Sequence, residues 1–219
     1  MKFFLDTANL NEIRSGVELG LVDGITTNPT LIAKEGRAIE DQIRAICDLV
    51  DGDISAEVVS VEAKEIIPEG RKLAKLHRNV VVKVPLIPEG LKAVKVLSSD
   101  CIRVNVTLCF SAVQALMAAK AGAYIISPFI GRLDDIASNG MDLIRNIAKI
   151  YQNYGFPTKI LAASIRGPLH VQDAALAGAH IATMPVKVLQ SLFSHPLTDK
   201  GLATFLADYR KAFQETTVG

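Results

Sequence analysis

Short apolar runs and helical segments alternate eight times along the chain, and this alternation constrains the fold more than any other feature. The runs are rich in β-branched residues, and we expect strands at 2–5, 24–26, 54–58, 80–84, 103–107, 124–128, 159–162 and 181–184. The segments between them place apolar residues at helical spacing, as in Ile39, Ile43 and Ile46. Because strands such as 80–84 are apolar on both faces, the sheet should be parallel and covered on both sides. Eight such units, with no glycine-rich phosphate-binding turn after the first strand, predict an α/β fold, a closed (β/α)8 TIM barrel.

Glycine recurs at the junctions between a helical segment and the next strand. Gly24, Gly52, Gly122 and Gly178 each take this place. We interpret all four as left-handed helix caps, a conformation that glycine adopts without steric cost.

A ninth apolar stripe follows the eighth unit. It consists of Leu202, Phe205, Leu206, Tyr209 and Phe213 at helical spacing, which predicts an additional C-terminal helix over 198–213. This helix packs either across its own barrel or on a neighbouring subunit, and both placements stay open here. A chain of 219 residues with 49% hydrophobic residues fits one barrel domain over 1–219.

The charge balance and the rare residues exclude several classes of partner. Lys and Arg number 24 against 23 Asp and Glu, so no net field attracts nucleic acid or an anionic membrane. No apolar run reaches membrane-spanning length, and the N-terminus does not resemble a signal peptide. Three irregularly spaced cysteines and four histidines without ligand spacing predict neither disulfides nor a metal site. We therefore expect a cytoplasmic protein with no cofactor.

Polar side chains lie at or just after the carboxyl ends of seven predicted strands, where the active sites of such barrels form. They are Asp6, Thr26, Asn28, Glu57, Lys83, Asn105, Thr107, Arg132, Ser164 and Arg166.

Lys83 is the most informative of these residues because it interrupts a run of valines that should be buried on both faces. Burial of an ammonium costs several kcal/mol, so we expect desolvation to lower the pKa of Lys83 and to give an amine that can attack a carbonyl. Asp6 and Glu57 are expected in the same cavity, as the proton-transfer groups that Schiff-base chemistry needs. The structural alternatives are that Lys83 reaches the rim or pairs with a carboxylate, and that Asp6 caps the helix beginning near Asn9.

Ser164 and Arg166 lie between a strand and a helix start and form a candidate anion site. Arg132 adds a second guanidinium from the neighbouring strand. The alternative for either arginine is an ion pair with Asp134 or Asp135.

Two motifs resemble the signatures of the transaldolase family. They are DGITTNPT at 23–30 and VKVP at 82–85 with EGL at 89–91, and the likeness runs from residue 2 to about 213. The chain is similar to the short transaldolases that share a subfamily with fructose-6-phosphate aldolase. The resemblance implies a metal-free cytoplasmic enzyme of the non-oxidative pentose phosphate pathway. Such an enzyme transfers dihydroxyacetone from sedoheptulose 7-phosphate or fructose 6-phosphate to glyceraldehyde 3-phosphate or erythrose 4-phosphate.

The resemblance also implies roles for individual residues. Lys83 matches the Schiff-base lysine, and Asp6 matches the residue that takes the C4 hydroxyl proton. Glu57 matches an acid/base that works through a water held by Thr107. The substrate-binding positions that it implies are Thr26, Asn28, Asn105, Phe129, Arg132, Ser164 and Arg166, the last three at the phosphate.

Two positions favour transaldolase over the aldolase, which releases free dihydroxyacetone. Similar aldolases carry Gln where this chain has Glu57 and Tyr where it has Phe129. The chain departs from its relatives at Ile87, where they usually have Thr or Ser, and we expect a helix cap to be lost there. Relatives form rings of five, often stacked in pairs, so the resemblance implies a pentamer or decamer with the terminal helix on a neighbour.

Two other classes remain open at this stage. One is a barrel isomerase that uses Glu57 as a base without covalent catalysis. The other is a catalytically silent sugar-phosphate binder or assembly subunit.

Overall fold

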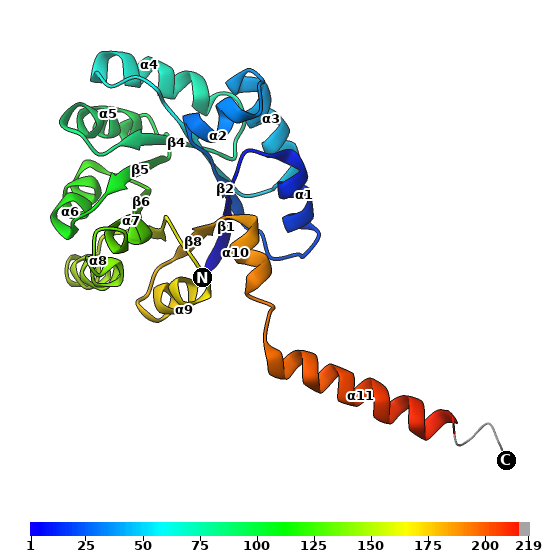
Figure 1. Ribbon diagram of the computed structural model, residues 1–219. Helices are drawn as coiled ribbons and strands as arrows, with labels where there is room; N and C mark the ends of the chain where they lie inside the picture. Colours follow the sequence, from blue (N-terminus) through cyan, green and yellow to red (C-terminus); the bar gives the residue numbers. More distant parts are fainter. Residues whose placement is uncertain (215–219) are drawn as a thin grey trace.

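Eight parallel strands form a closed barrel in the computed structural model, which describes residues 1–214 (Figure 1). The strands are β1 (Lys2–Asp6), β2 (Gly24–Thr26), β3 (Asp53–Glu57), β4 (Val80–Pro85), β5 (Val104–Cys109), β6 (Ile125–Pro128), β7 (Lys159–Ala162) and β8 (Ile181–Met184). Each strand pairs with the next one in the chain, and β1 pairs with β8 to close the ring. The predicted (β/α)8 TIM barrel is confirmed, with strand boundaries within two residues of those expected.

Helices cover the outside of the barrel (Figure 1). The helices of residues 1–214, including α11, which does not cover the barrel, are α1 (Leu10–Val17), α2 (Pro29–Lys34), α3 (Ile39–Leu49), α4 (Ala63–Ala74), α5 (Pro88–Ser99), α6 (Ala112–Ala121), α7 (Ile130–Asp134), α8 (Gly140–Tyr154), α9 (Pro168–Leu176), α10 (Val186–Ser191) and α11 (Pro196–Gln214). Two short helices, α2 and α7, follow β2 and β6 directly and precede the longer helices α3 and α8. The sequence pattern alone does not separate these short helices from the longer ones.

The alternation of side chains along β4 explains why this strand is apolar on both faces. Val80, Val82 and Val84 pack in the layer between the sheet and the helices. Val81 belongs to a second, smaller cluster inside the barrel. Lys83 lies two residues further on and therefore points to the same side as Val81, into the barrel.

The glycine junctions are of two kinds. Gly122 and Gly178 have φ of 97° and 85° and confirm the predicted left-handed caps. The same interpretation is wrong for Gly24 and Gly52, which do not have positive φ. A Cβ on Gly24 would lie 2.5 Å from the carbonyl oxygen of Asp53, and one on Gly52 would lie 2.0 Å from that of Asp23. These two glycines are required by close backbone approach.

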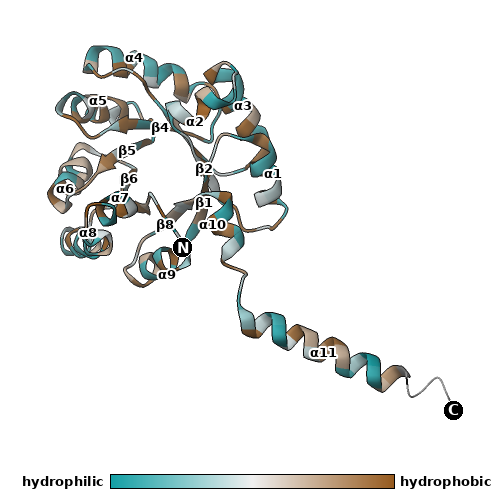
Figure 2. Cartoon of the chain, in the orientation of Figure 1, coloured by the Kyte–Doolittle hydropathy of each residue, from teal (hydrophilic) through white to brown (hydrophobic). Residues whose placement is uncertain are grey.

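The C-terminal helix α11 extends away from the barrel as an arm (Figure 1). It begins two residues before the predicted 198–213 helix, and polar and apolar bands alternate along it in Figure 2. Its apolar stripe is exposed, with Phe205 at 73% and Tyr209 at 63% exposure. The alternative that this helix packs across its own barrel is therefore wrong. Residues 215–219, which the predicted domain 1–219 includes, lie outside the described residues.

Candidate active site

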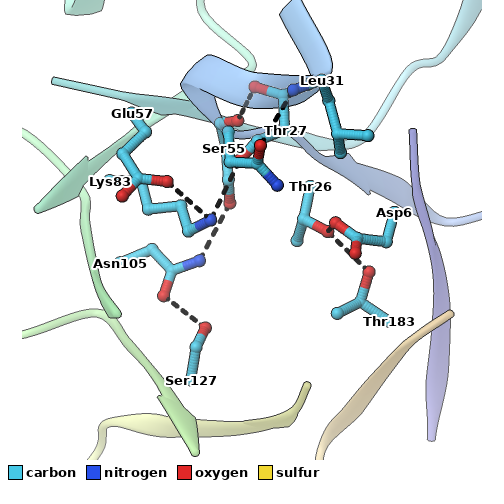
Figure 3. Close-up of polar contacts among 11 residues, drawn as sticks. Asp6, Thr26, Thr27, Leu31, Ser55, Glu57, Lys83, Asn105, Ser127 and Thr183 are labelled. Carbon is cyan, nitrogen blue, oxygen red and sulfur yellow. Dashed lines mark hydrogen bonds and ion pairs between the residues drawn. The ribbon is translucent and has the colours of Figure 1, made fainter. Parts of the chain in front are cut away.

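Lys83 is held inside the carboxyl-terminal half of the barrel by two contacts (Figure 3). The residue is 6% exposed, so its side chain does not reach the rim. Nζ lies 2.9 Å from Oε2 of Glu57 on β3 and donates a hydrogen bond of 2.9 Å to the carbonyl oxygen of Thr27. Glu57 and Lys83 are direct partners in the β3–β4 register, which places their side chains next to each other. Of the structural alternatives for Lys83, the ion pair with Glu57 is the one that forms.

Lys83 lines two cavities at the carboxyl ends of the strands. The first, of about 250 Å³, holds Asp6, Thr26, Ser164 and Arg166. The second, of about 380 Å³, holds Glu57 and Thr107. The residues shared by both cavities are Asn28, Lys83, Phe129 and Arg132. The structure thus brings all the predicted site residues to one end of the barrel, and all except Asn105 line a cavity.

Asp6 lies at the end of β1 and is held by a neighbouring hydroxyl. Its Oδ1 accepts a hydrogen bond of 2.9 Å from Oγ1 of Thr26 on β2. That Oγ1 lies 2.7 Å from Oγ1 of Thr183 on β8, so three strands contribute to this group of side chains (Figure 3). The alternative that Asp6 caps α1 is wrong, because the cap of that helix is Asn9.

Asn105 lies beneath the cavities, and its side-chain amide is fixed at both ends. Nδ2 donates to Oγ of Ser55 at 3.0 Å, and Oδ1 accepts from Oγ of Ser127 at 2.7 Å. All three side chains are buried, and Ser127 lines the first cavity. Asn105 therefore orients a hydroxyl that faces the cavity.

The wall of the second cavity contains two unusual features. Oγ1 of Thr107 is fully buried and has no hydrogen-bond partner in residues 1–214. The next residue, Leu108, has φ of 62°, at the point where the β5–β6 register shifts. A positive φ outside glycine is uncommon, and strained residues of this kind tend to cluster at functional sites, although Cys101 and Ala137 have one outside this site. Asn28 closes the wall as the cap of α2, with Oδ1 accepting from the backbone N–H of Leu31 at 2.9 Å.

The two arginines of the candidate anion site have different surroundings. Arg132 lies over the ring of Phe129, 4.9 Å from its centre. Arg166 pairs with Asp135 at 2.7 Å, as the alternative interpretation of this residue expected, and also lines the first cavity. Ser164 has φ of 62°, the second strained residue at a strand end of this site.

Four polar residues of the site were missed by the sequence analysis. They are Thr27, Ser55, Ser127 and Thr183, which supply the carbonyl that binds Lys83 and the hydroxyls that hold Asn105 and Thr26. The sequence feature that could have identified these residues is a Ser or Thr within, or directly after, a strand that is buried on both faces.

The described residues offer no ready metal site and no membrane span. Nowhere in residues 1–214 do three His, Cys, Asp or Glu side chains gather closely enough to hold a metal ion. None of the helices in this part of the chain has the length and apolar composition needed to cross a membrane.

Comparison with known proteins identifies the family. The family described as Transaldolase/Fructose-6-phosphate aldolase matches residues 3–218. A protein named "Probable transaldolase" from Desulfatibacillum aliphaticivorans is 60% identical over 212 residues, which cover 97% of this chain and 99% of that protein. "Probable transaldolase 1" from Bacillus cereus is 61% identical, with 96% and 98% covered, and "Probable transaldolase" from Clostridium perfringens is 55% identical, with 98% and 100% covered. The chain belongs to the transaldolase/fructose-6-phosphate aldolase family.

Proposed function

We propose that this chain is a transaldolase that works through a Schiff base on Lys83. The donor is a ketose phosphate, sedoheptulose 7-phosphate or fructose 6-phosphate, and the acceptor is glyceraldehyde 3-phosphate or erythrose 4-phosphate. One observation carries the proposal. A buried lysine, paired with Glu57 at 2.9 Å, faces a cavity that also contains Asp6 and the guanidinium groups of Arg132 and Arg166.

The first half of the reaction attaches the donor. Nζ of Lys83 attacks the ketone carbon as a free amine, so one ammonium proton leaves first, and Glu57 is the acceptor within reach. The resulting carbinolamine loses water only when its hydroxyl is protonated, and Glu57 returns the proton for this step. The unpartnered hydroxyl of Thr107 supports a bridging water between Glu57 and the substrate.

The second half breaks and forms the carbon–carbon bond. Asp6 takes the proton of the C4 hydroxyl, the bond between C3 and C4 breaks, and its electron pair is delocalised into the enamine on Lys83. The aldose phosphate leaves, and the enamine carbon attacks the acceptor aldehyde, whose oxygen takes the proton back from Asp6. Limited water access to the cavity protects the enamine from hydrolysis between these two events. Water then hydrolyses the new imine, which frees the ketose phosphate and Lys83.

The anion site gives the reaction its preference for phosphorylated sugars. Arg132, Arg166 and Ser164 line the first cavity on the side of β6 and β7. The guanidinium of Arg166, which pairs with Asp135, also forms strong charge-assisted hydrogen bonds with phosphate. A phosphate bound there therefore competes with Asp135 for Arg166.

Glu57 and Phe129 favour transfer over release of free dihydroxyacetone. A carboxylate at 2.9 Å from Nζ can move a proton in both directions, which an amide does not do. Phe129 lies under Arg132 and has no hydroxyl to hold a water near the enamine.

A transfer assay tests the proposal. Wild-type protein with fructose 6-phosphate and erythrose 4-phosphate should form sedoheptulose 7-phosphate, measured by chromatography with mass detection. Lys83→Met should abolish the product. Lys92→Met should retain it, because Lys92 is exposed on α5 and pairs there with Glu89. Accumulation of free dihydroxyacetone without sedoheptulose 7-phosphate would instead identify an aldolase, and turnover by Lys83→Met would overturn the covalent mechanism.

We further propose that α11 docks on a second copy of the chain, in a ring of five or a decamer. The exposed stripe of Leu202, Phe205, Leu206, Tyr209 and Phe213 supports this, since a helix with such a stripe is stabilised by a partner. Deletion from Leu202 onward should lower the number of chains per particle, calculated from the mass that light scattering measures. An unchanged number of chains would contradict the proposal.

Three free cysteines, at positions 47, 101 and 109, support a reducing compartment such as the cytoplasm.

A further inference from the structure

Asp6 is flanked by hydroxyl groups from both neighbouring strands. Asp6 pairs in register with Thr26 of β2, and on the other side β1 pairs with β8, which carries Thr183. Oγ1 of Thr26 lies 2.9 Å from Oδ1 of Asp6 and 2.7 Å from Oγ1 of Thr183. Figure 3 shows the three side chains grouped together, on the opposite side of the view from Lys83.

The chemistry of the three groups leaves one arrangement of protons. An ionised carboxylate only accepts hydrogen bonds, and a threonine hydroxyl has one proton to donate. Thr26 therefore donates its proton to Asp6, and Thr183 has to donate to Thr26. Both threonines are 3% exposed, so water does not readily replace either contact.

This arrangement determines which carboxylate oxygen can act on a substrate. Oδ1 of Asp6 accepts from Thr26, whereas no hydrogen bond to Oδ2 is found among residues 1–214. Asp6 lines the first cavity, so Oδ2 is the oxygen available to a substrate hydroxyl there. Hydrogen bonds in a chain polarise one another, so the donor at Thr183 strengthens the contact that holds Oδ1.

We propose that Thr183 is a positioning residue for Asp6. By donating to Thr26, it directs the Thr26 proton to Oδ1 and keeps Oδ2 oriented to accept the proton of the C4 hydroxyl. The inference rests on the proposed function, since it assigns Thr183 to the cleavage step and not to formation of the Schiff base.

Four variants test this role: Thr183→Val, Thr183→Ser, Thr26→Val and the double variant Thr183→Val/Thr26→Val. Valine keeps the shape of threonine and removes its hydroxyl. Loss of one buried hydrogen bond predicts that Thr183→Val lowers kcat about 3- to 10-fold. KM for fructose 6-phosphate should stay within about twofold, and Thr183→Ser should restore most of kcat. In the Thr26→Val background, Thr183→Val should change kcat less than about twofold, because its effect passes through Thr26.

Reductive trapping separates the two steps. Borohydride added during turnover of fructose 6-phosphate reduces the imine on Lys83, and mass spectrometry distinguishes the intact six-carbon adduct from the three-carbon adduct left after cleavage. In Thr183→Val the six-carbon adduct should rise relative to the three-carbon adduct, with the total amount unchanged.

A matched control excludes a general effect of stability. Thr158 is also buried, at 2% exposure, and donates to the carbonyl oxygen of Ala123 at the opposite end of the barrel. Thr158→Val should therefore change the melting temperature but neither kcat nor the adduct ratio.

The outcomes distinguish this inference from the proposed function. Additive effects of Thr183→Val and Thr26→Val, a change confined to KM, or failure of Thr183→Ser to restore kcat would each overturn the role of Thr183. Absence of any adduct on Lys83 of the wild-type protein would overturn the proposed function, and this inference with it.

Discussion

The ion pair between Lys83 and Glu57 should couple the two residues strongly in folding as well as in catalysis. Nζ and Oε2 are 2.9 Å apart, and the two side chains are 7% and 14% exposed. Removal of one partner of a buried pair leaves an uncompensated charge and costs about 3–5 kcal/mol. Glu57 retains some access to water, and Gln at position 57 still accepts a hydrogen bond. We therefore expect Lys83→Met and Glu57→Gln each to lower the free energy of unfolding by about 2–3 kcal/mol.

The double variant Lys83→Met/Glu57→Gln should recover most of this loss, because it buries no unpaired charge. Replacement of a whole buried pair is often close to neutral, so we expect it within about 1 kcal/mol of the wild type. The coupling free energy, the sum of the two single losses minus the loss in the double variant, is then about 3–6 kcal/mol. For a chain of this size, each single variant should lower the melting temperature by about 4–12 °C.

Denaturant and thermal unfolding at pH 7 and one protein concentration measure these quantities. The control is the surface pair of Arg71 and Asp100, whose atoms are 2.8 Å apart but whose side chains are 48% and 36% exposed. Arg71→Met/Asp100→Asn should show a coupling below about 1 kcal/mol. A coupling between Lys83 and Glu57 as small as that of the control would refute the reasoning.

Three further predictions concern the surroundings of the site and the stability of the barrel. A Cβ at Gly131 would lie 2.1 Å from the carbonyl oxygen of Ser164, so Gly131→Ala should displace α7. In steady-state assays this variant should have a higher KM for phosphorylated sugars, and an unchanged KM would contradict the prediction. Burial raises the pKa of the Cys109 thiol to about 12, so a thiol reagent at pH 8 should modify only the exposed Cys101 until the protein is unfolded, and rapid loss of a second thiol would count against it. Ile87 occupies the cap position of α5 in extended conformation and makes no side-chain hydrogen bond there. Ile87→Ser should therefore raise the free energy of unfolding by about 0.5–2 kcal/mol, and a lower melting temperature in calorimetry would contradict this.

The barrel could be predicted because its signal is repeated. Most strands are short and buried on both faces, and eight such runs alternating with helical segments are typical of a parallel sheet covered by helices. The inward direction of Lys83 follows from the same alternation, because Lys83 lies two residues after Val81. The position of Asp6 and Glu57 at the same end of the barrel follows from the parallel direction of the strands.

The contacts within the site could not be predicted because they depend on the stagger between strands. Thr183 touches Thr26 only because β8 closes the ring next to β1, and no local pattern gives that register. The close approach at Gly52 is likewise set by a distant segment, which a local interpretation as a helix cap does not include. The exposed position of α11 could not be predicted either, because its apolar stripe fits a helix packed across its own barrel as well as one packed on a neighbouring subunit.

The most direct measurement is reductive trapping of the donor on the wild-type protein. Borohydride and fructose 6-phosphate should leave one covalent adduct per chain, and peptide mapping should locate it at Lys83. A protein that turns over the sugar phosphate while Lys83 remains unmodified, or an adduct on another lysine, would contradict the account.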